Sequence, residues 1–283
     1  MRKLLTTAAF VFSAAAATPA FAQDDYGPGE FDGFYAGGSI GATFSSSDDD
    51  ETILFDRNLD GTFGDTVTTA PPANANAFST GFCSGSVGTS STRPASGCET
   101  EDRALEFSGR IGFDRQMDTF VLGAVLEVGT TDYSSSVTAF STTPASYTFT
   151  REVELLANLR LRAGVTVTPT TLLYVTGGVG YAQLDNSFTT TNTANGVTRN
   201  LDDDSIGYVL GAGVEQKLGR NFSIGVEYLY QQYQDESSVR LGNSGTTPAT
   251  NPFLLGSPNG TDFIRSEDKF TLQSVRAVAT FRF

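Results

Sequence analysis

Eight segments of the chain alternate between two kinds of residue, and this alternation most constrains the fold. Successive side chains of a β-strand point to opposite faces, so alternation assigns each residue to one face of a sheet. In every segment one face is built from Phe, Tyr, Ile, Leu, Val, Ala and Gly and carries no charged residue. The predicted strands span residues 34–44, 104–114, 120–130, 152–167, 173–183, 206–217, 222–233 and 270–283.

A lipid bilayer explains this uncharged face. Each segment reaches the roughly nine to eleven residues that a tilted strand needs to cross a membrane. A charged side chain that faces lipid at the bilayer centre costs about 2–4 kcal/mol, which accounts for the exclusion of charge. After Ala22 no run of residues approaches the length of an apolar membrane helix, so a helical membrane protein is excluded.

The connections between the segments alternate in length. Short turns at one end and long loops at the other are typical of an outer-membrane barrel. The sequence therefore predicts an all-β, transmembrane, eight-stranded antiparallel up-and-down β-barrel with long extracellular loops. A further hairpin hidden in the first or fourth loop would make ten strands. We expect one barrel domain over residues 23–283, with a long first loop at about 45–103.

The opposite face of the strands carries six acidic and six basic residues. The interior of an eight-stranded barrel is just wide enough for side chains to fill, and unpaired charges there are costly. Equal numbers therefore predict a closed interior filled by ion pairs. Three of the residues lie near strand ends, and solvation at the periplasmic rim is the alternative for them: Asp114, Lys217 and Arg282. The others are Glu106, Arg110, Glu127, Glu154, Arg160, Arg162, Glu215, Glu227 and Arg276.

The first 22 residues have the form of a secretory signal peptide. Arg2 and Lys3 precede a short apolar run, and a small-residue cleavage site follows at residues 20–22. We expect a mature chain that begins at Gln23 and is exported to the outer membrane; an uncleaved anchor is the alternative. Without the two cations of this segment, 16 Lys and Arg face 32 Asp and Glu, a balance that argues against binding to nucleic acid.

Two cysteines, Cys83 and Cys98, lie in a stretch rich in Gly, Ser and Thr. An even number of cysteines in an exported protein predicts a disulfide. A loop of about fifteen residues closed in this way gains roughly 3 kcal/mol in the chain-entropy model.

One local motif matches a calcium-binding loop. Asp56, Asn58 and Asp60 supply oxygens at alternate positions, Gly61 allows a sharp turn, and Thr62 supplies a carbonyl. The twelfth position of such a loop is normally a glutamate, but here it is a valine. A Ca²⁺ ion in the first loop is one interpretation, and a metal-free acidic turn is the other; we expect no other cofactor.

The chain contains no histidine. Histidine is the usual general base of hydrolytic and acyl-transfer enzymes, and the two lysines of the mature chain have no convincing serine partner in the sequence. We therefore predict that the protein is not an enzyme.

Four motifs resemble the opacity-type, OmpA-barrel-like outer-membrane proteins of Gram-negative bacteria, notably alphaproteobacteria. They are GFYAGGSIG at 33–41, LYVTGGVGYA at 173–182, GAGVE at 211–215 and AVATFRF at 277–283. The resemblance covers nearly all predicted strands and little of the loops. It implies an eight-stranded barrel whose last strand, with Phe281 and Phe283, is the signal for the barrel-assembly machinery. No periplasmic peptidoglycan-binding domain is expected after that strand.

The function predicted from these features is envelope structure and surface interaction through acidic, disulfide-tied loops on a plugged barrel. A small passive porin for small solutes is the main alternative, and a soluble periplasmic barrel is another. The expected surroundings are outer-membrane lipid and an extracellular ligand or surface that loop composition does not name. Oligomeric state is likewise left open by the sequence.

Overall fold

The computed structural model describes residues 30–45, 51–86 and 103–283. The predicted signal peptide at 1–22, the predicted mature start at Gln23 and the second cysteine, Cys98, lie outside these residues. The disulfide between Cys83 and Cys98 therefore stays a prediction, and Cys83 itself is buried.

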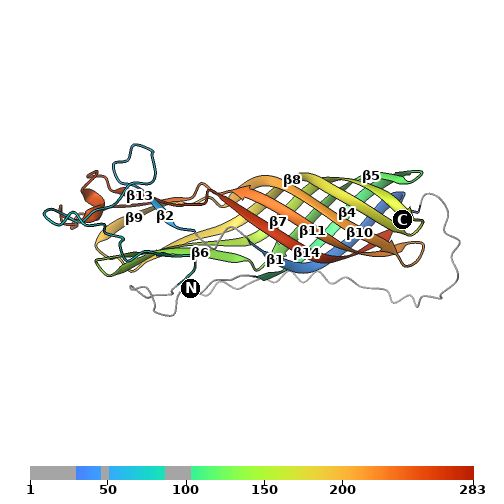
Figure 1. Cartoon of the computed structure of the whole chain (residues 1–283), viewed down its shortest axis with the longest axis horizontal. Helices are drawn as coiled ribbons and strands as arrows, with labels where there is room; N and C mark the ends of the chain where they lie inside the picture. The colour runs from blue at the N-terminus through green and yellow to red at the C-terminus, as the bar shows by residue number, and fades with distance from the viewer. Residues whose placement is uncertain (1–29, 46–50, 87–102) are drawn as a thin grey trace.

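Eight antiparallel strands close into a barrel, as predicted (Figure 1). Strand β1 pairs with both β14 and β4, and β7 pairs with β8 to complete the circle. Short turns and the C terminus lie at one end of the barrel, which we call the short-turn end. The barrel strands are β1 (Gly33–Phe44), β4 (Ala104–Met117), β5 (Phe120–Thr131), β7 (Ala145–Thr168), β8 (Thr171–Thr190), β10 (Asp204–Lys217), β11 (Phe222–Gln234) and β14 (Lys269–Arg282).

The outer face of the barrel is apolar and exposed, as the alternation predicts. Leu161 and Ile206 expose 72% and 74% of their surface, and similar residues surround the whole barrel. None of the helices found among the described residues has the length and apolarity needed to cross a membrane.

One strand departs from strict alternation. The pairing of β7 with β8 shifts between Val153 and Leu155, which is the signature of a β-bulge. On the N-terminal side of the bulge the extra residue reverses which side chains face inward. Val153 is therefore buried and Glu154 is exposed. The prediction that Glu154 belongs to the interior charge network was therefore wrong.

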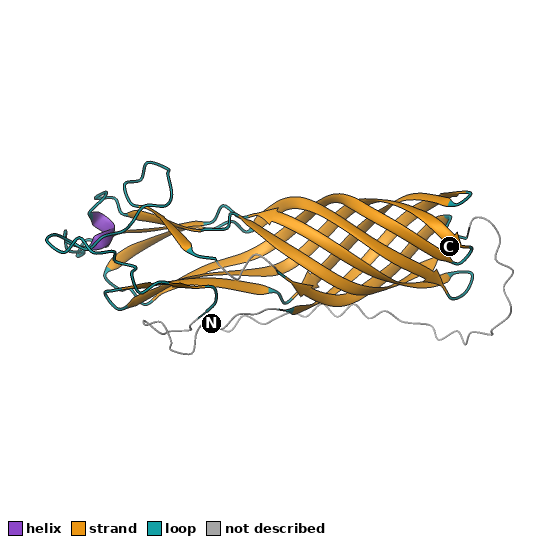
Figure 2. Cartoon of the chain, viewed as in Figure 1, coloured by secondary structure: helices purple, strands orange, loops and turns teal. Residues whose placement is uncertain are grey.

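The described residues of the four long connections fold into a second structure at the other end, which we call the head (Figure 2). One of its sheets extends β7 and β8 with β6 and β3, and the other has the order β2-β13-β12-β9. These strands lie outside the barrel circle, so a ten-stranded barrel is not formed. The head elements are β2 (Ile53–Asp56), β3 (Phe82–Cys83), β6 (Ser134–Ser141), β9 (Asn195–Asn200), β12 (Ser238–Asn243), β13 (Thr261–Arg265) and the 3₁₀ turn η1 (Pro252–Leu254).

Strands β7 and β8 support the head because they continue past the barrel. They contain 24 and 20 residues, about twice the length needed to cross a bilayer. Residues Tyr147, Phe149 and Phe188 on these extensions enter the apolar core of the head. The head is thus built directly on two barrel strands.

Aromatic side chains from different connections form the centre of the head core. Phe263 is fully buried, and its ring lies edge-on to Phe55 with centroids 4.8 Å apart. Tyr147 contacts Phe78 at 5.5 Å and Phe253 at 5.6 Å, both in edge-to-face geometry. Aromatic pairs in this range add about 0.5–1.5 kcal/mol each beyond burial. The head therefore has a core of its own.

Tyr147 makes the head sensitive to alkaline pH. Burial raises the pKa of Tyr147 to about 12, whereas a tyrosine in an unfolded chain titrates near about 10. Because the pKa is higher in the folded state, the buried neutral phenol contributes fully to the stability of the head below about pH 10. This contribution is lost as the pH rises toward about 12. The difference between the two pKa values corresponds to a loss of roughly 3 kcal/mol in the free energy of unfolding.

We therefore expect Tyr147→Phe to retain the near-ultraviolet circular dichroism of the folded head at about pH 11 better than the unmodified chain does. At neutral pH the same variant loses the 3.0 Å hydrogen bond that Asn192 donates to the phenol oxygen. Tyr228→Phe, on the outer face of the barrel, is the control. Identical alkaline transitions for the unmodified chain and Tyr147→Phe would contradict this assignment.

Candidate functional site: the barrel interior

The middle of the barrel contains three arginines and three glutamates, which we call the central cluster. They come from strands β4, β5, β7, β11 and β14 and are buried. Equal numbers of opposite charges make the cluster neutral. Its members, all predicted from the alternation, are Glu106, Arg110, Glu127, Arg160, Glu227 and Arg276.

Arg276 connects all three carboxylates of the central cluster. Its Nη1 lies 2.7 Å from Glu106 Oε1 and 2.7 Å from Glu127 Oε1, and its Nη2 lies 2.5 Å from Glu227 Oε2. The side chain is wholly inaccessible to solvent. A guanidinium offers five N–H donors in a fixed plane, which suits it to bridge several carboxylates.

The other two arginines complete the network. Arg110 Nη2 lies 2.5 Å from Glu127 and 2.9 Å from Glu227. Arg160 approaches the same two carboxylates at 3.1 and 3.4 Å. Glu127 and Glu227 therefore each face three guanidinium groups. A buried carboxylate deprived of such partners costs several kcal/mol, so the pairs depend on one another.

A second group of charges, the lower cluster, lies toward the short-turn end. Arg282 Nη2 is 3.0 Å from Asp114 Oδ2, and Arg162 Nη1 is 3.4 Å from the same oxygen. Arg162 and Arg282 also pair with Glu215. Asp114 and Arg282 are buried rather than solvated at the rim.

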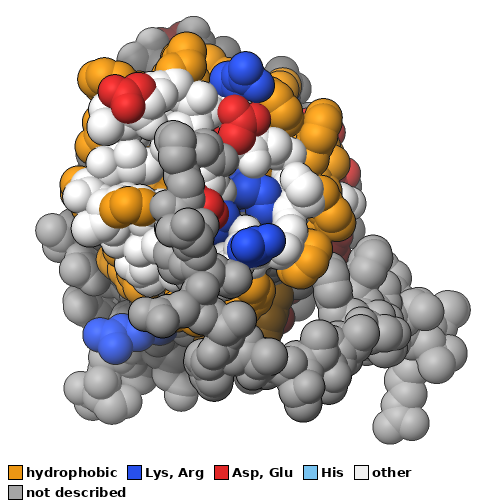
Figure 3. Space-filling model, turned by 90° about the vertical axis from the view of Figure 1, so that its right-hand side faces the viewer, with side chains coloured by type: hydrophobic (Ala, Val, Ile, Leu, Met, Phe, Trp, Pro, Cys, Tyr) orange, Lys and Arg blue, Asp and Glu red, His pale blue; other side chains and the backbone are white. Residues whose placement is uncertain are grey.

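Residues just before β1 close the short-turn end. Lys217 Nζ lies 2.7 Å from Glu30 Oε2. Lys217 is thus buried and paired, like the other two residues for which solvation at the rim was the alternative. Phe31 is fully buried, and its carbonyl accepts a 2.8 Å hydrogen bond from Arg282 Nη1. Figure 3 shows this end, with charged side chains in the middle and apolar side chains around them.

Two glycines provide room for aromatic rings in the lower part of the interior. A Cβ on Gly112 would lie 2.3 Å from the ring of Tyr35, and a Cβ on Gly213 would lie 2.5 Å from the ring of Tyr174. Tyr174 donates a 3.0 Å hydrogen bond to Glu227 Oε1, and the Arg162 guanidinium lies 3.9 Å from its ring centroid. Gly213 thus leaves room for Tyr174 to contact both clusters, and Gly112 leaves room for Tyr35 in the lower one.

An apolar layer and further ion pairs separate the central cluster from the head. Arg151 Nη2 lies 2.5 Å from Asp235 Oδ2, and its guanidinium lies 4.5 Å from the Phe270 ring centroid. Burial acts to raise the pKa of Asp235, but attraction to Arg151 and hydrogen bonds from Ser237 outweigh it and hold the pKa below its usual value. The apolar layer consists of Tyr133, Val153, Leu156, Ala182, Leu184, Tyr233, Phe270 and Leu272.

Sequence reasoning missed the ion pairs at the base of the head. Arg265 on β13 pairs with Glu51, 214 residues away in sequence, and donates to the Ser135 carbonyl at 3.3 Å. Arg151 lies on the head side of the bulge in β7, where the phase of the alternation is reversed. The fully buried Arg151 and the buried Arg265 link separate connections to one another.

The calcium-like motif forms a tight turn. The Asp56 carboxylate accepts hydrogen bonds from the backbone N–H groups of Leu59, Asp60 and Gly61. Asn58 Nδ2 donates to Asp60 Oδ2 at 2.9 Å, and Asp60 Oδ1 accepts from the N–H of Thr62. Across the described residues, no group of three or more His, Cys, Asp or Glu is placed to bind a metal. Calcium binding at Asp56, Asn58, Asp60 and Thr62 stays a prediction.

The aromatic residues of the predicted assembly signal lie on the outer face at the short-turn end. Phe281 and Phe283 expose 49% and 76% of their surface, and their ring centroids are 5.4 Å apart. Their reading by the barrel-assembly machinery stays a prediction.

Comparison with known proteins identifies the family. The family model described as "outer membrane protein beta-barrel domain" matches residues 6–256 of this chain. The chain belongs to this family. It is therefore a protein of the bacterial outer membrane, with the exposed apolar face toward lipid and the paired charges inside.

Individual relatives agree with this placement. The 31 kDa outer-membrane immunogenic protein of Brucella melitensis is 31% identical over 136 residues, which cover 47% of this chain and 55% of the relative. The match thus spans about half of the curated relative. Superposition on the crystal structure of OprG from Pseudomonas aeruginosa covers 92% of this chain and 100% of the OprG chain. The TM-score is 0.50 and the sequence identity is 14%. At this identity the likeness to OprG shows the fold alone.

The central cluster predicts a sharp contrast between two variants. Arg276→Ala leaves three buried carboxylates without their shared cation, and breaking a buried pair costs roughly 3–5 kcal/mol. We expect that loss in urea unfolding of the protein in lipid vesicles. Glu154→Gln is the matched control and should change stability by less than about 0.5 kcal/mol, because Glu154 is exposed. Equal effects of the two variants would contradict the assignment of faces.

Proposed function

We propose that this protein is a closed outer-membrane barrel that displays a folded β-sandwich head outside the cell, where the head contacts molecules or surfaces. The observation that carries the proposal is the combination of a neutral central cluster, in which each charged side chain has an ion-pair partner, with a head that has its own aromatic core. A filled interior favours an anchor, and a packed head favours a specific contact surface.

The charge of the head base suggests the kind of surface that it contacts. Glu152 and Asp185 are directly opposite each other on β7 and β8, and both are exposed on the outer face. Glu154 on β7 is also exposed, as are Asp204 at the start of β10, which pairs with β8, and Asp203 just before it. Negative charges placed together attract cationic partners and repel anionic ones.

The Brucella relative supports display at the surface. Its name states that it is an immunogenic outer-membrane protein. We extend accessibility to antibodies from that protein to the head of this chain. The expectation of a non-enzymatic protein also belongs to this proposal, because the buried carboxylates and guanidinium groups of the two clusters are engaged with one another.

A passive pore for small solutes is the competing function. A pore needs a polar interior, and this barrel has one. However, Arg276, Arg160 and Glu227 occupy the middle of that interior. Conduction would require these side chains to separate, at a cost of several kcal/mol for each buried charge that loses its partner.

Protease treatment of intact cells tests display. An antibody against the head should bind intact cells, and the unmodified head should resist protease because its core is packed. Phe263→Ala should make the head cleavable, since truncating a buried phenylalanine costs about 3–5 kcal/mol. Phe222→Ala, on the outer face of the barrel, is the control and should leave the head resistant.

Two results would contradict the proposal. Antibody binding only after the cells are permeabilised would place the head on the other side of the membrane. Equal cleavage of the unmodified head and of Phe263→Ala would mean that the aromatic core does not hold the head together.

A further inference from the structure

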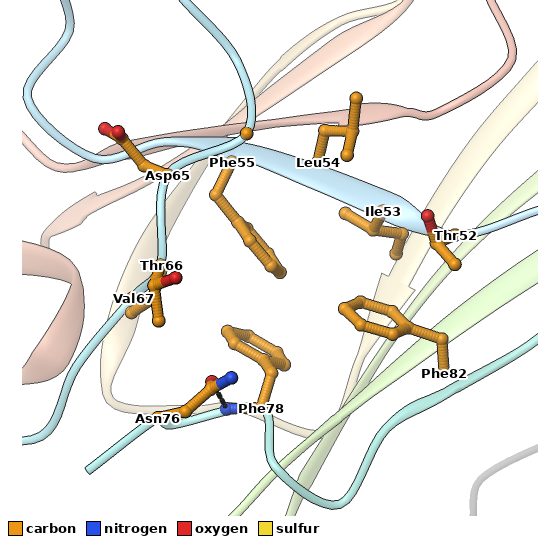
Figure 4. Close-up of a pocket in the computed structure, with 11 residues that line it drawn as sticks. Thr52, Ile53, Leu54, Phe55, Asp65, Thr66, Val67, Asn76, Phe78 and Phe82 are labelled. Carbon is orange, nitrogen blue, oxygen red and sulfur yellow. Dashed lines mark hydrogen bonds between the residues drawn. The ribbon is translucent and has the colours of Figure 1, made fainter.

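We infer that the head contains a binding pocket for one small neutral molecule with a single aromatic ring, of the phenol class. The pocket has a volume of about 200 Å³ and is formed by residues between Thr52 and Phe82 (Figure 4). It lies where the edge strand β2 of one sheet comes near β3 of the other. The inference goes beyond surface display and does not depend on which side of the membrane the head occupies.

Aromatic and aliphatic side chains form the inside of the pocket. Figure 4 shows the rings of Phe55, Phe78 and Phe82 and the side chain of Ile53 pointing into the space, whereas Leu54 and Asp65 point away from it. Phe55 and Phe78 stack closely, with centroids 4.5 Å apart. Phe82 stands further off, at 6.2 and 6.4 Å from these two rings, and is only partly buried.

Hydrogen bonds hold the pocket wall in place without a ligand. The backbone N–H groups of Gly64 and Asp65 both donate to the Phe55 carbonyl at 2.9 Å. Asp65 Oδ2 accepts a 2.9 Å hydrogen bond from the N–H of Arg57, and Ala77 N donates to the Val67 carbonyl at 2.8 Å. The turn at the calcium-like motif thus fixes the segment that forms one side of the pocket. A preformed site lowers the ordering cost of binding.

The volume limits the ligand to a single ring. An apolar cavity of about 150 Å³ accommodates benzene, and pockets for drug-sized molecules are about 300–1,000 Å³. A space of about 200 Å³ therefore suits a molecule with one ring and one or two substituents. A sugar with several rings or a fatty acyl chain would fit only in part and would extend out of the open side of the pocket.

The polar groups of the pocket favour a neutral ligand with a hydroxyl group. Thr66 and Asn76 line the rim, where an alcohol or amide can exchange hydrogen bonds with a phenol. The residues that line the pocket include Asp65 and no Lys or Arg. An organic anion would therefore enter without a cation to compensate its charge.

A tryptophan reporter tests the pocket directly. The chain has no tryptophan, so Phe82→Trp in the full-length protein places a single fluorophore on the pocket wall. Titration with 4-fluorophenol should change its emission saturably, with a dissociation constant below about 1 mM. Tyr208→Trp, on the lipid-facing surface, is the matched control and should respond only by non-saturable partitioning of the probe into the detergent.

Two further measurements make the result specific. Adding Thr66→Phe to the reporter variant should weaken binding at least tenfold, because the new ring enters the mouth of the pocket. Benzoate, which is anionic, should bind at least tenfold more weakly than 4-fluorophenol. Fluorine NMR of 4-fluorophenol with the unmodified protein gives the same answer without the tryptophan, as saturable line broadening.

The inference is overturned by any of three results. These are a response of Phe82→Trp that is as linear as that of Tyr208→Trp, together with no saturable broadening in the NMR titration; equal affinity with and without Thr66→Phe; or benzoate binding as tight as that of 4-fluorophenol.

Discussion

Neutralisation of charge inside a narrow barrel is the constraint on which this structure depends. The apolar residues of each strand face lipid, so the alternate residues must fill an interior with little room for water. Arg276 meets the cost of burial by contacting three carboxylates at 2.5–2.7 Å, and Glu127 and Glu227 each face three guanidinium groups. Since five of the six charges of the central cluster each contact two or three partners, the strands that carry them are held in one register. An interior built in this way supports the barrel, and under the proposed function it also blocks the passage of solutes.

The head follows from the same scaffold. Strands β7 and β8 continue beyond the barrel and carry Tyr147, Phe149 and Phe188 into a core that the other connections complete. Ion pairs at the base, such as Arg151 with Asp235, link the head to the barrel mouth. Because the core packs against ordered strands, long connections rich in Ser, Thr and Gly fold into a sandwich. The pocket beside Phe82 is a consequence of joining two sheets whose edge strands do not meet.

Much of the barrel could be predicted from the sequence, because lipid imposes a rule on each residue separately. The eight strands and the central cluster follow from alternation alone. Glu154 was misplaced because the β-bulge after Val153 leaves no mark on the pattern. The head strands were missed because they are short and gain stability from partners far along the chain. The ion pair between Glu51, just before β2, and Arg265 on β13 is one example. The acidic motif at Asp56 was informative about a tight turn, while its metal stays a prediction.

Ion conductance of the purified, full-length protein in planar lipid bilayers tests the central claim most directly. If Arg276, Arg160 and their carboxylate partners fill the interior, the unmodified protein should insert without producing stable current steps. Reproducible, long-lived steps from the unmodified protein would mean that the paired charges do not close the barrel, and the account would be contradicted.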